Sequence, residues 1–382
     1  MCTFTVGIVT VSPASKSPAS NTSTPPAETS PTTSNTARTP SDGTAFDSGW
    51  QPDRLLDRYE VRTFDLGRDP DGEDPITATL IRKPTTSAHA SKGAVLYVHG
   101  FTDYFFHEPL ADHFHERGYA FYALDLRKCG RSLLAQHTPH FARDLAVYDL
   151  ELGLALDAIA DDFSVDTPVL VAAHSTGGLI TPLWLDRLRA ASPERHARVS
   201  GLLLNSPWLD LQGEPVLRSY PVTMFIKGVA AVRPFEKLSR ELSGAYGESL
   251  HVDSHGEWSY DLTMKPLGGF PVTFGFLNAV RSGQRHLHHG IDVGVPTLVL
   301  RSDKTKFAKN YSSAVDVADA VLDVSQIARW SGSLGGHVTV APITGARHDV
   351  FLSVASARAQ AYAEVDRWLD SVVEPIRQEH AS

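Results

Sequence analysis

The sequence predicts an α/β protein with a mostly parallel central sheet, helices on both faces and one inserted segment. Short runs of apolar and β-branched residues, such as residues 93–100, are typical of buried parallel strands. Segments with apolar residues at helical spacing follow these runs, and strands that alternate with helices imply a parallel sheet covered on both faces. The alternation stops between the strands near Leu204 and Leu298, which indicates an insertion.

The individual elements follow from the same periodicities. Residues 59–65 alternate between apolar and polar side chains, and residues 77–82 are their expected hairpin partner across a turn rich in Asp, Pro and Gly. We expect further strands at 93–100, 119–125, 199–205, 296–300 and 338–343, and helices at 108–117, 141–160 and 356–373.

The domain organisation follows from changes in composition. Residues 1–45 are predicted to be a disordered tail, because Ser, Thr, Pro and Ala dominate there and cannot bury enough apolar surface to offset the ordering entropy. The core is then expected in two parts, residues 46–206 and 293–382. Between them, residues 207–292 are irregular and rich in Gly, Pro and aromatic residues, and we interpret them as an inserted cap.

Composition limits the classes of partner. The chain has 382 residues, of which 42% are hydrophobic, enough for a large core, and its formal net charge of −9 argues against nucleic acid as a partner. Two distant cysteines, Cys2 and Cys129, form neither a disulfide framework nor a metal-ligand spacing.

No apolar run is long enough for an integral membrane segment. The first residues lack the basic region of a signal peptide, so we expect a cytoplasmic protein, with secretion left open.

The stretch from Val169 to Leu179 carries the main chemical signal. It begins as a buried strand, turns through Ala173-His-Ser-Thr-Gly177, and continues as an apolar helix from Gly178 to about Ala190. This strand–turn–helix pattern matches the nucleophile elbow G-x-S-x-G, with Ala173 in place of the first glycine. Ser175 at the tip of the turn is therefore the candidate nucleophile.

A serine nucleophile requires a general base and an acid that orients it. His348 lies in the loop after the last predicted strand, the position expected for the base in an elbow enzyme. Two acids compete for the third role. Asp303 directly follows the strand at 296–300, and position alone slightly favours it, whereas Asp319 stands at the start of a predicted helix.

The oxyanion that forms during acyl transfer needs two backbone N–H donors. Thr176, the residue after the serine, is expected to supply one. Phe101 should supply the other, because it follows the strand that ends at His99 and Gly100, where glycine permits a tight turn.

Together these residues resemble the α/β-hydrolase superfamily and, within it, the monoacylglycerol lipase and lysophospholipase-like group with a serine aminopeptidase S33-type domain. The resemblance covers residues 59–373, and Lys128 replaces a usual glycine of that group. It is carried by four motifs, which are Tyr97-Val-His-Gly-Phe-Thr-Asp-Tyr104, Asp125-Leu-Arg-Lys-Cys-Gly-Arg-Ser132, Ala173-His-Ser-Thr-Gly-Gly178 and Gly345-Ala-Arg-His-Asp-Val-Phe351.

The resemblance implies an α/β-hydrolase fold and carboxylic ester hydrolysis through an acyl-enzyme. It also favours Asp319 as the acid, since Asp319-Ala-Val-Leu-Asp323 is similar to the D-x-V-V-D pattern of that group. Asp303 remains the second candidate, and residues 304–318 are then an extra segment between the strand and the acid.

The substrate pocket is expected under the cap, where aromatic residues would enclose an apolar acyl or aromatic group. About half of the cap aromatics should instead form the cap's own small core. The residues predicted to contact substrate are Phe101, His174, Trp258, Tyr260, Phe270 and Phe274.

We expect neither a metal nor a cofactor, because the His-rich run at 286–289 has no carboxylate or cysteine partner at ligand spacing. The expected partner is a small apolar ester, and the sequence favours no oligomeric state. A peptidase or amidase of the same fold and a non-catalytic ligand-binding member are the alternatives. An aminopeptidase would need cap carboxylates for the substrate amine, and Glu257 and Asp261 are the candidates.

Overall fold

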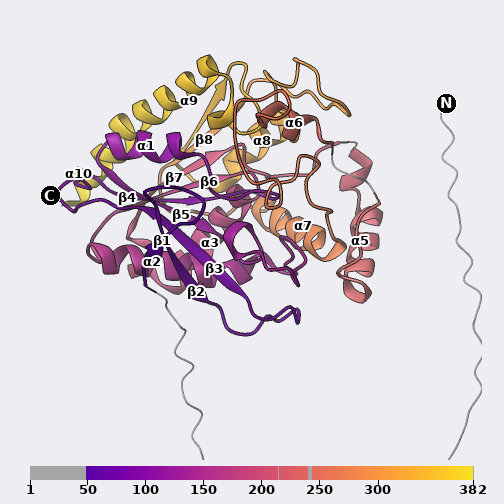
Figure 1. The fold of residues 1–382 in the computed structure, drawn as a ribbon, viewed down its shortest axis with the longest axis horizontal. Coiled ribbons are helices and arrows are strands. Elements are labelled where there is room, and N and C mark those ends of the chain that lie inside the picture. The colour runs from indigo at the N-terminus through magenta and orange to yellow at the C-terminus, as the bar shows by residue number, and fades with distance from the viewer. Residues whose placement is uncertain (1–48, 214, 240–242, 382) are drawn as a thin grey trace, which may run out of the picture. The chain divides into compact units, whose positions relative to one another are not determined.

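In the computed structural model, nine strands form one sheet across the described residues 49–213, 215–239 and 243–381 (Figure 1). The tail predicted at residues 1–45 lies outside these ranges. The strands are β1 Gln51–Pro52, β2 Glu60–Asp65, β3 Thr77–Lys83, β4 Gly93–Val98, β5 Tyr119–Asp125, β6 Val169–His174, β7 Val199–Asn205, β8 Thr297–Ser302 and β9 Val338–Ile343.

Helices connect and follow these strands. The α-helices are α1 Glu108–Glu116, α2 Asp149–Asp162, α3 Gly177–Ala191, α4 Pro193–His196, α5 Tyr220–Val232, α6 Ala245–Leu250, α7 Phe274–His288, α8 Val324–Trp330, α9 Ala355–Trp368 and α10 Glu374–Ala381. The shorter helical turns are η1 Gly130–Ser132, η2 Leu145–Tyr148, η3 Pro215–Arg218, η4 Ser331–Leu334, η5 Val350–Leu352 and the π-helical η6 Leu369–Val373.

The strand order across the sheet is β1-β2-β3-β5-β4-β6-β7-β8-β9. In the order of the sheet, the six strands β5, β4, β6, β7, β8 and β9 pair in parallel. The pairs β1–β2, β2–β3 and β3–β5 are antiparallel. The predicted hairpin and the mostly parallel sheet are therefore confirmed. Strand β1 was not predicted, because a two-residue pairing carries no readable alternation.

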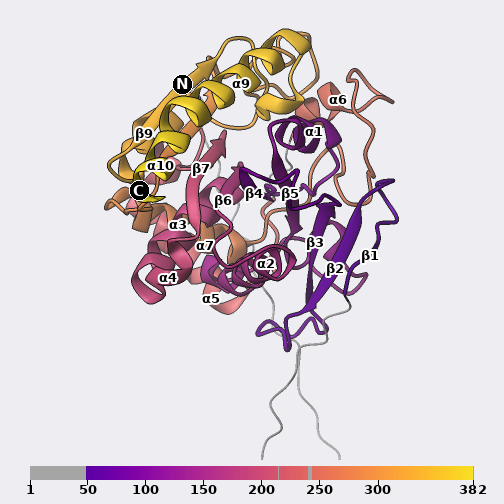
Figure 2. The same ribbon diagram turned by 90° about the vertical axis from the view of Figure 1, so that its left-hand side faces the viewer.

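Both faces of the sheet are covered, as the continuous apolar strands predicted. Along β4, Leu96 and Val98 pack with residues of α2 and α3 on one face, whereas Val95 and Tyr97 pack with residues of α1 and α9 on the other. Figure 2 shows these two pairs of helices on opposite sides of the strands. The sheet is therefore buried on both faces. Because the strands are parallel, their carboxyl ends lie at one edge of the sheet.

Two helix predictions need correction. The helix expected at 141–160 begins only at Asp149, because His140 has a left-handed backbone with φ of +58° and Asp144 caps a separate 3₁₀ turn, η2, by accepting the N–H of Ala146. The closing helix expected at 356–373 ends as an α-helix at Trp368, and the π turn η6 links it to α10.

The segment expected to be an irregular cap, residues 207–292, contains three helices in its described part, α5, α6 and α7. Helix α7 packs on α3 so closely that a Cβ on Gly283 would lie 2.8 Å from a methyl carbon of Leu183. Phe276 and Val280 of α7 consequently belong to the main apolar core. Within the described residues, no helix combines the length and the apolar character that a membrane crossing requires.

Candidate active site

The turn between β6 and α3 places Ser175 in a strained conformation. Its φ is +50°, a region that non-glycine residues seldom adopt. The turn also brings α3 against the end of β4, since a Cβ on Gly177 would lie 2.5 Å from the carbonyl oxygen of His99. A Cβ on Gly178 would lie 2.7 Å from the side chain of Pro207. The two glycines at the start of α3 therefore allow this sharp turn to form.

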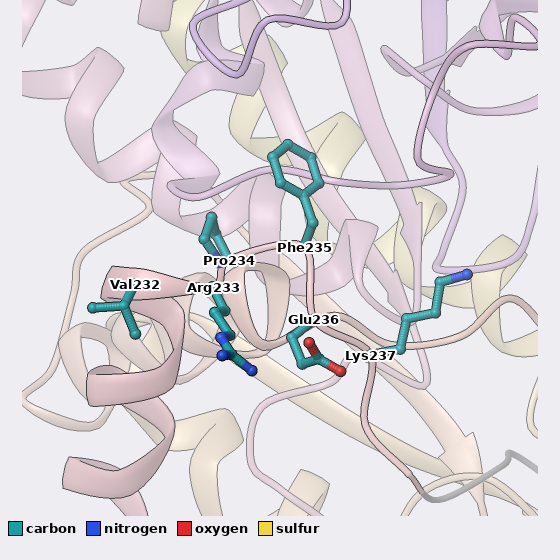
Figure 3. Close-up of a pocket in the computed structure, with 6 residues that line it drawn as sticks. All are labelled: Val232, Arg233, Pro234, Phe235, Glu236 and Lys237. Carbon is teal, nitrogen blue, oxygen red and sulfur yellow. The ribbon is translucent and has the colours of Figure 1, made fainter. Parts of the chain in front are cut away.

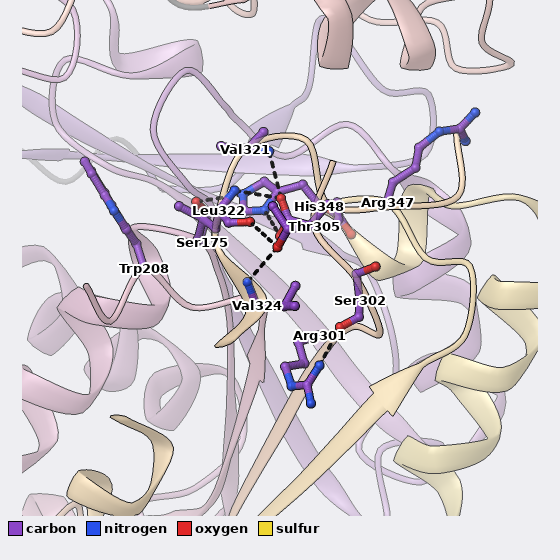
Figure 4. A network of polar contacts seen from close by, with 12 residues as sticks. Ser175, Trp208, Arg301, Ser302, Thr305, Val321, Leu322, Val324, Arg347 and His348 are labelled. Atoms are coloured by element: carbon purple, nitrogen blue, oxygen red, sulfur yellow. Dashed lines mark hydrogen bonds and ion pairs between the residues drawn. The ribbon is translucent and has the colours of Figure 1, made fainter. Parts of the chain in front are cut away.

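Ser175, His348 and Asp319 lie in one hydrogen-bonded relay (Figure 4). The Oγ of Ser175 is 3.0 Å from Nε2 of His348, and Nδ1 of His348 is 2.9 Å from Oδ2 of Asp319. Exposure falls along the relay from 8% at Ser175 to 3% at His348 and 0% at Asp319. A serine next to an imidazole that a buried carboxylate orients is the arrangement that nucleophilic catalysis requires.

The backbone holds Asp319 in place. Its Oδ1 accepts the N–H groups of Val321 and Leu322 at 2.8 and 2.7 Å, which leaves Oδ2 for the imidazole. Its own backbone pairs with Thr305, just beyond β8. Asp319 therefore lies in a turn and not at the start of a helix, because α8 begins at Val324, where Asp323 caps it.

Asp303, the second candidate, points elsewhere. Its side chain is exposed and accepts the N–H of Gly345 at 3.1 Å. The structure thus brings Asp319, and not Asp303, to the ring of His348.

The loop that carries His348 is fixed to the end of β7. Asn205 donates its side-chain N–H to Oδ1 of Asp349 at 2.6 Å and accepts the N–H of Val350 at 3.1 Å. Tyr246 of α6 accepts the N–H of Asp349 through its hydroxyl at 3.2 Å, and its ring meets the imidazole of His348 edge-on at 5.6 Å. The imidazole is consequently held from both the sheet and the inserted segment.

The loop at residues 100–104, which follows β4, passes next to Ser175. A Cβ on Gly100 would lie 2.9 Å from Cβ of Ser175. His99 accepts the N–H of Leu126 at Nε2, so its Nδ1 carries the proton and donates to the Gly100 carbonyl at 2.7 Å. This contact fixes the Gly100–Phe101 peptide plane, because the carbonyl and the N–H of a trans peptide point in opposite directions.

Within the described part of the chain, the N–H groups of Phe101 and Thr176 have no hydrogen-bond partner. Both belong to turns that adjoin Ser175, and the Thr176 amide also lies at the N-terminal end of α3, where the helix dipole favours negative charge. They are available to an oxyanion.

His174 lies behind the relay. Burial lowers the pKa of His174 to about 4, so the ring is neutral at pH 7. Its Nδ1 donates to the carbonyl of Asn205 at 3.2 Å, and its ring centre is 4.8 Å from that of His348. These contacts pack the His174 ring beside that of His348.

The aromatic residues predicted to contact substrate separate into two groups. Phe101 stacks on Phe276 of α7 at 5.1 Å, and both Phe101 and Phe270 lie against the ring of His140, at 4.8 and 5.7 Å. Phe274 contacts Phe225 of α5 edge-on at 6.0 Å.

Trp258 and Tyr260 form the second group and belong to a small separate cluster with Tyr104, Phe106, Leu250 and Leu352. Their polar atoms donate to the carbonyls of Leu352 and Gly247, at 3.0 and 3.3 Å. Their contacts are those of a local cluster that also includes residues outside the predicted cap.

Three residues that the sequence analysis did not select also adjoin the relay, namely Trp208, Asn205 and Tyr246. The N–H of Trp208 donates to the carbonyl of Ser175 at 2.9 Å, and Figure 4 draws both residues. Asn205 ends β7 and Trp208 follows it. Ligands of open α/β sheets usually bind at the carboxyl ends of strands, so this position was an available signal. Tyr246 carried none, because its helix lies in the irregular insertion.

A hollow of about 480 Å³ lies away from the relay, at the end of α5 (Figure 3). Its lining runs along one stretch of backbone from Val232 to Lys237. Among the described residues, no group of three or more His, Cys, Asp or Glu side chains could hold a metal ion.

Known proteins share the fold that carries this site. The family model for serine aminopeptidase, S33, matches residues 89–353. Among solved structures, the chain is similar to a monoacylglycerol lipase from Paleococcus ferrophilus, with 16% identity, a TM-score of 0.54, and 72% of this chain and 93% of that chain covered. A monoglyceride lipase from Saccharomyces cerevisiae gives 16% identity, a TM-score of 0.53, and 79% and 92% coverage.

A thermostable carboxyl esterase from Bacillus coagulans gives 14% identity, a TM-score of 0.55, and 83% and 100% coverage. No curated protein sequence matches the chain. At these identities the solved structures establish the fold, and the family match covers well over half of the chain. The chain belongs to the serine aminopeptidase S33 family of hydrolases and has the α/β-hydrolase fold.

Proposed function

We propose that the protein is a carboxylic ester hydrolase whose catalytic triad is Ser175, His348 and Asp319. The observation that carries this proposal is the relay itself, with contacts of 3.0 and 2.9 Å that start from a serine on a strained turn. A weakly nucleophilic hydroxyl needs an adjacent base, and the base needs a fixed orientation. The Oγ–Nε2 and Nδ1–Oδ2 distances support these two roles.

The reaction proceeds through an acyl-enzyme. His348 takes the hydroxyl proton as Oγ of Ser175 attacks the ester carbonyl, and the Phe101 and Thr176 amides stabilise the oxyanion. Collapse of the tetrahedral intermediate expels the alcohol, which receives the proton from His348. Water, deprotonated by the same imidazole, then attacks the acyl carbonyl. The bond to Oγ breaks, His348 returns the proton to Ser175, and the acid leaves. Asp319 stabilises the imidazolium throughout.

An apolar ester fits the surroundings of the serine better than a peptide with a free amine. We propose that residues 207–292 act as the cap, and that Phe101, Phe270, Phe274 and Trp208 line the acyl site. The acids that an aminopeptidase would use for the substrate amine are engaged otherwise. Glu257 pairs with Arg358 at 2.7 Å, and Asp261 accepts the N–H and hydroxyl of Thr263.

Turnover of p-nitrophenyl esters of increasing acyl-chain length tests this proposal. We expect the wild-type protein to hydrolyse these esters. In Ser175→Ala the rate should fall to that of the uncatalysed reaction. Ser206→Ala is a matched control, because Ser206 is also buried with a positive φ and its hydroxyl has no partner in the described chain. Activity that persists in Ser175→Ala would show that the triad is misassigned.

A parallel panel of aminoacyl amides separates the two hydrolase classes. Esterase activity should exceed amide cleavage on matched acyl groups. The opposite ranking would favour a peptidase, and binding of the esters without turnover by the wild-type protein would favour a non-catalytic member of the fold.

A further inference from the structure

Three consecutive residues of the 100–104 loop contact one segment of the insertion, residues 261–270. Thr102 accepts the N–H of Phe270 through its hydroxyl at 2.9 Å, and Tyr104 accepts the N–H of Asp261 through its hydroxyl at 2.8 Å. Between them, Oδ1 of Asp103 pairs with Nζ of Lys265 at 2.6 Å. The contacts therefore run along the loop, one residue after another.

The central contact is a buried ion pair. The Asp103 and Lys265 side chains are only 3% and 9% exposed, and the ammonium lies 5.6 Å from the ring centre of Phe106 and 5.8 Å from that of Tyr260. Burial opposes ionisation of Asp103, but the charge of Lys265 prevails and holds the pKa of this carboxyl well below its usual range. A buried pair adds little net stability compared with apolar residues, and it can instead specify one conformation.

The loop needs such support because its backbone is strained. Thr102 has a φ of +53°, and its N–H donates to Nε2 of His140 at 3.1 Å. His99 and His140 thus hold the loop from the core, while Thr102, Asp103 and Tyr104 attach it to residues 261–270. Phe101, whose amide is the proposed oxyanion donor, lies between the two sets of contacts.

We infer that residues 261–270 position the oxyanion loop, and that Lys265 is the positioning residue whose pairing with Asp103 keeps the Phe101 amide directed at the reacting carbonyl. This inference rests on the proposed function and assigns the insertion a role in the chemical step besides that of lining the acyl site. Lys265 touches no reacting atom. Its effect passes through Asp103, whose Oδ2 accepts the N–H of Gly100, the residue before Phe101, at 3.5 Å.

The test asks whether Lys265 stabilises the transition state more than it stabilises the bound substrate. Lys265→Met should lower kcat for p-nitrophenyl esters by about 10–100-fold, somewhat less than the loss of a whole oxyanion donor, and should change KM by less than about 3-fold. An apolar trifluoromethyl ketone reports the same step. Ser175 Oγ bonds to its carbonyl carbon, the proton passes to His348, and the oxygen becomes an oxyanion.

Affinity for the trifluoromethyl ketone should therefore fall by the same factor as kcat. Affinity for the methyl ketone of equal chain length, which hardly forms the oxyanion, should stay within about 3-fold. Lys265→Arg should recover part of the loss. Lys83→Met is the matched control, since it removes a lysine that pairs with Asp112 outside the site, and its kcat should be unchanged.

If Lys265→Met fails to fold because Asp103 is left buried without its partner, two other variants that leave the ion pair intact still test the inference. Thr102→Val and Tyr104→Phe remove one acceptor each at nearly constant shape, and both should lower kcat by about 3–10-fold with KM preserved. Unchanged kcat in these variants, or a loss confined to KM, overturns the inference. Ser175→Ala, measured alongside, distinguishes this from failure of the proposed function, because activity retained there refutes the triad itself.

Discussion

The Asp319 carboxylate divides its two oxygens between the backbone and the imidazole. Oδ1 accepts hydrogen bonds from two backbone N–H groups, and Oδ2 accepts a hydrogen bond from Nδ1–H of His348. A fully buried carboxylate needs such partners, because leaving any of its lone pairs unsatisfied would carry a large desolvation cost. The two backbone donors also fix the rotation of the carboxylate, so Oδ2 has one direction in which to point.

Asp319→Asn should therefore lower kcat for ester hydrolysis by about 10³–10⁴-fold, because an amide that presents N–H to Nδ1 stabilises the wrong imidazole tautomer. Asp303→Asn should leave kcat within about 2-fold, since Asp303 is exposed and bonds to Gly345. Steady-state kinetics on one p-nitrophenyl ester checks both variants. The reverse ranking would transfer the acid role to Asp303.

The choice between Asp303 and Asp319 shows what can be predicted at the scale of single residues. Position after the strand favoured Asp303, while the resemblance favoured Asp319. Residues 304–318 explain the conflict, because they leave the sheet after β8 and return so that Asp319 pairs with Thr305. In space, Asp319, the proposed acid, still follows β8. A chain excursion that closes by one backbone bridge leaves no periodic signal, so position alone could not place Asp319 next to His348.

At the scale of elements, the elbow depends on the close approach of α3 to β4. The space for a side chain at Gly177 is occupied by two carbonyl oxygens, those of His99 and Val98, at 2.5 and 2.7 Å from the ideal Cβ. Ala173, which replaces the first glycine of the motif, is buried in β6 without such a conflict. The motif therefore tolerates alanine before the serine more readily than after it.

Gly177→Ala should destabilise the protein by about 3 kcal/mol, because backbone atoms of β4 would have to move to admit the methyl group. Gly228→Ala is the control, since this glycine lies in α5 with nothing within 4 Å of an added Cβ. It should stabilise the protein by roughly 0.5–1 kcal/mol through helix propensity. Urea denaturation of both variants measures the difference. Equal effects would mean that the approach of α3 to β4 is not tight.

Elements were predictable where one periodicity extended over the whole element. The strands from β4 to β9 were found within a few residues, because burial on both faces makes them continuously apolar. Helix α2 was placed eight residues too early, since the apolar spacing continues through the 3₁₀ turn η2. The cap and the substrate contacts of Trp258, Tyr260, Phe270 and Phe274 remain predictions.

At the scale of the whole molecule, the sheet and the insertion share one core. Helix α7 packs on α3, Tyr246 of α6 supports the His348 loop, and residues 261–270 contact the 100–104 loop. The inserted segment thus contacts both the loop that carries His348 and the 100–104 loop. Composition marked the insertion as irregular, but it could not reveal these long-range contacts, because each joins residues far apart in the sequence.

Trp50 is the first side chain of the described region that packs on the sheet. Its indole N–H donates to Asp162 at 3.1 Å, its ring lies 6.1 Å from that of Tyr122, and the guanidinium of Arg82 lies 4.0 Å from its centre. Asp162 also binds Arg82 and Tyr122, so Trp50 completes a cluster that joins β3, β5 and the end of α2.

Deletion of residues 1–47 should leave ester turnover and the thermal midpoint unchanged, because the deleted stretch is mostly Ser, Thr, Pro and Ala and Trp50 is retained. Deletion of residues 1–52 removes Trp50 and β1. It should cost roughly 2 kcal/mol, about half the value for a fully buried tryptophan, and lower the midpoint by a few degrees. Trp50→Ala in the full chain should reproduce most of this loss. If both deletions lower the midpoint equally, the stabilising contacts begin before Trp50 and the N-terminal boundary of the folded unit lies within the predicted tail.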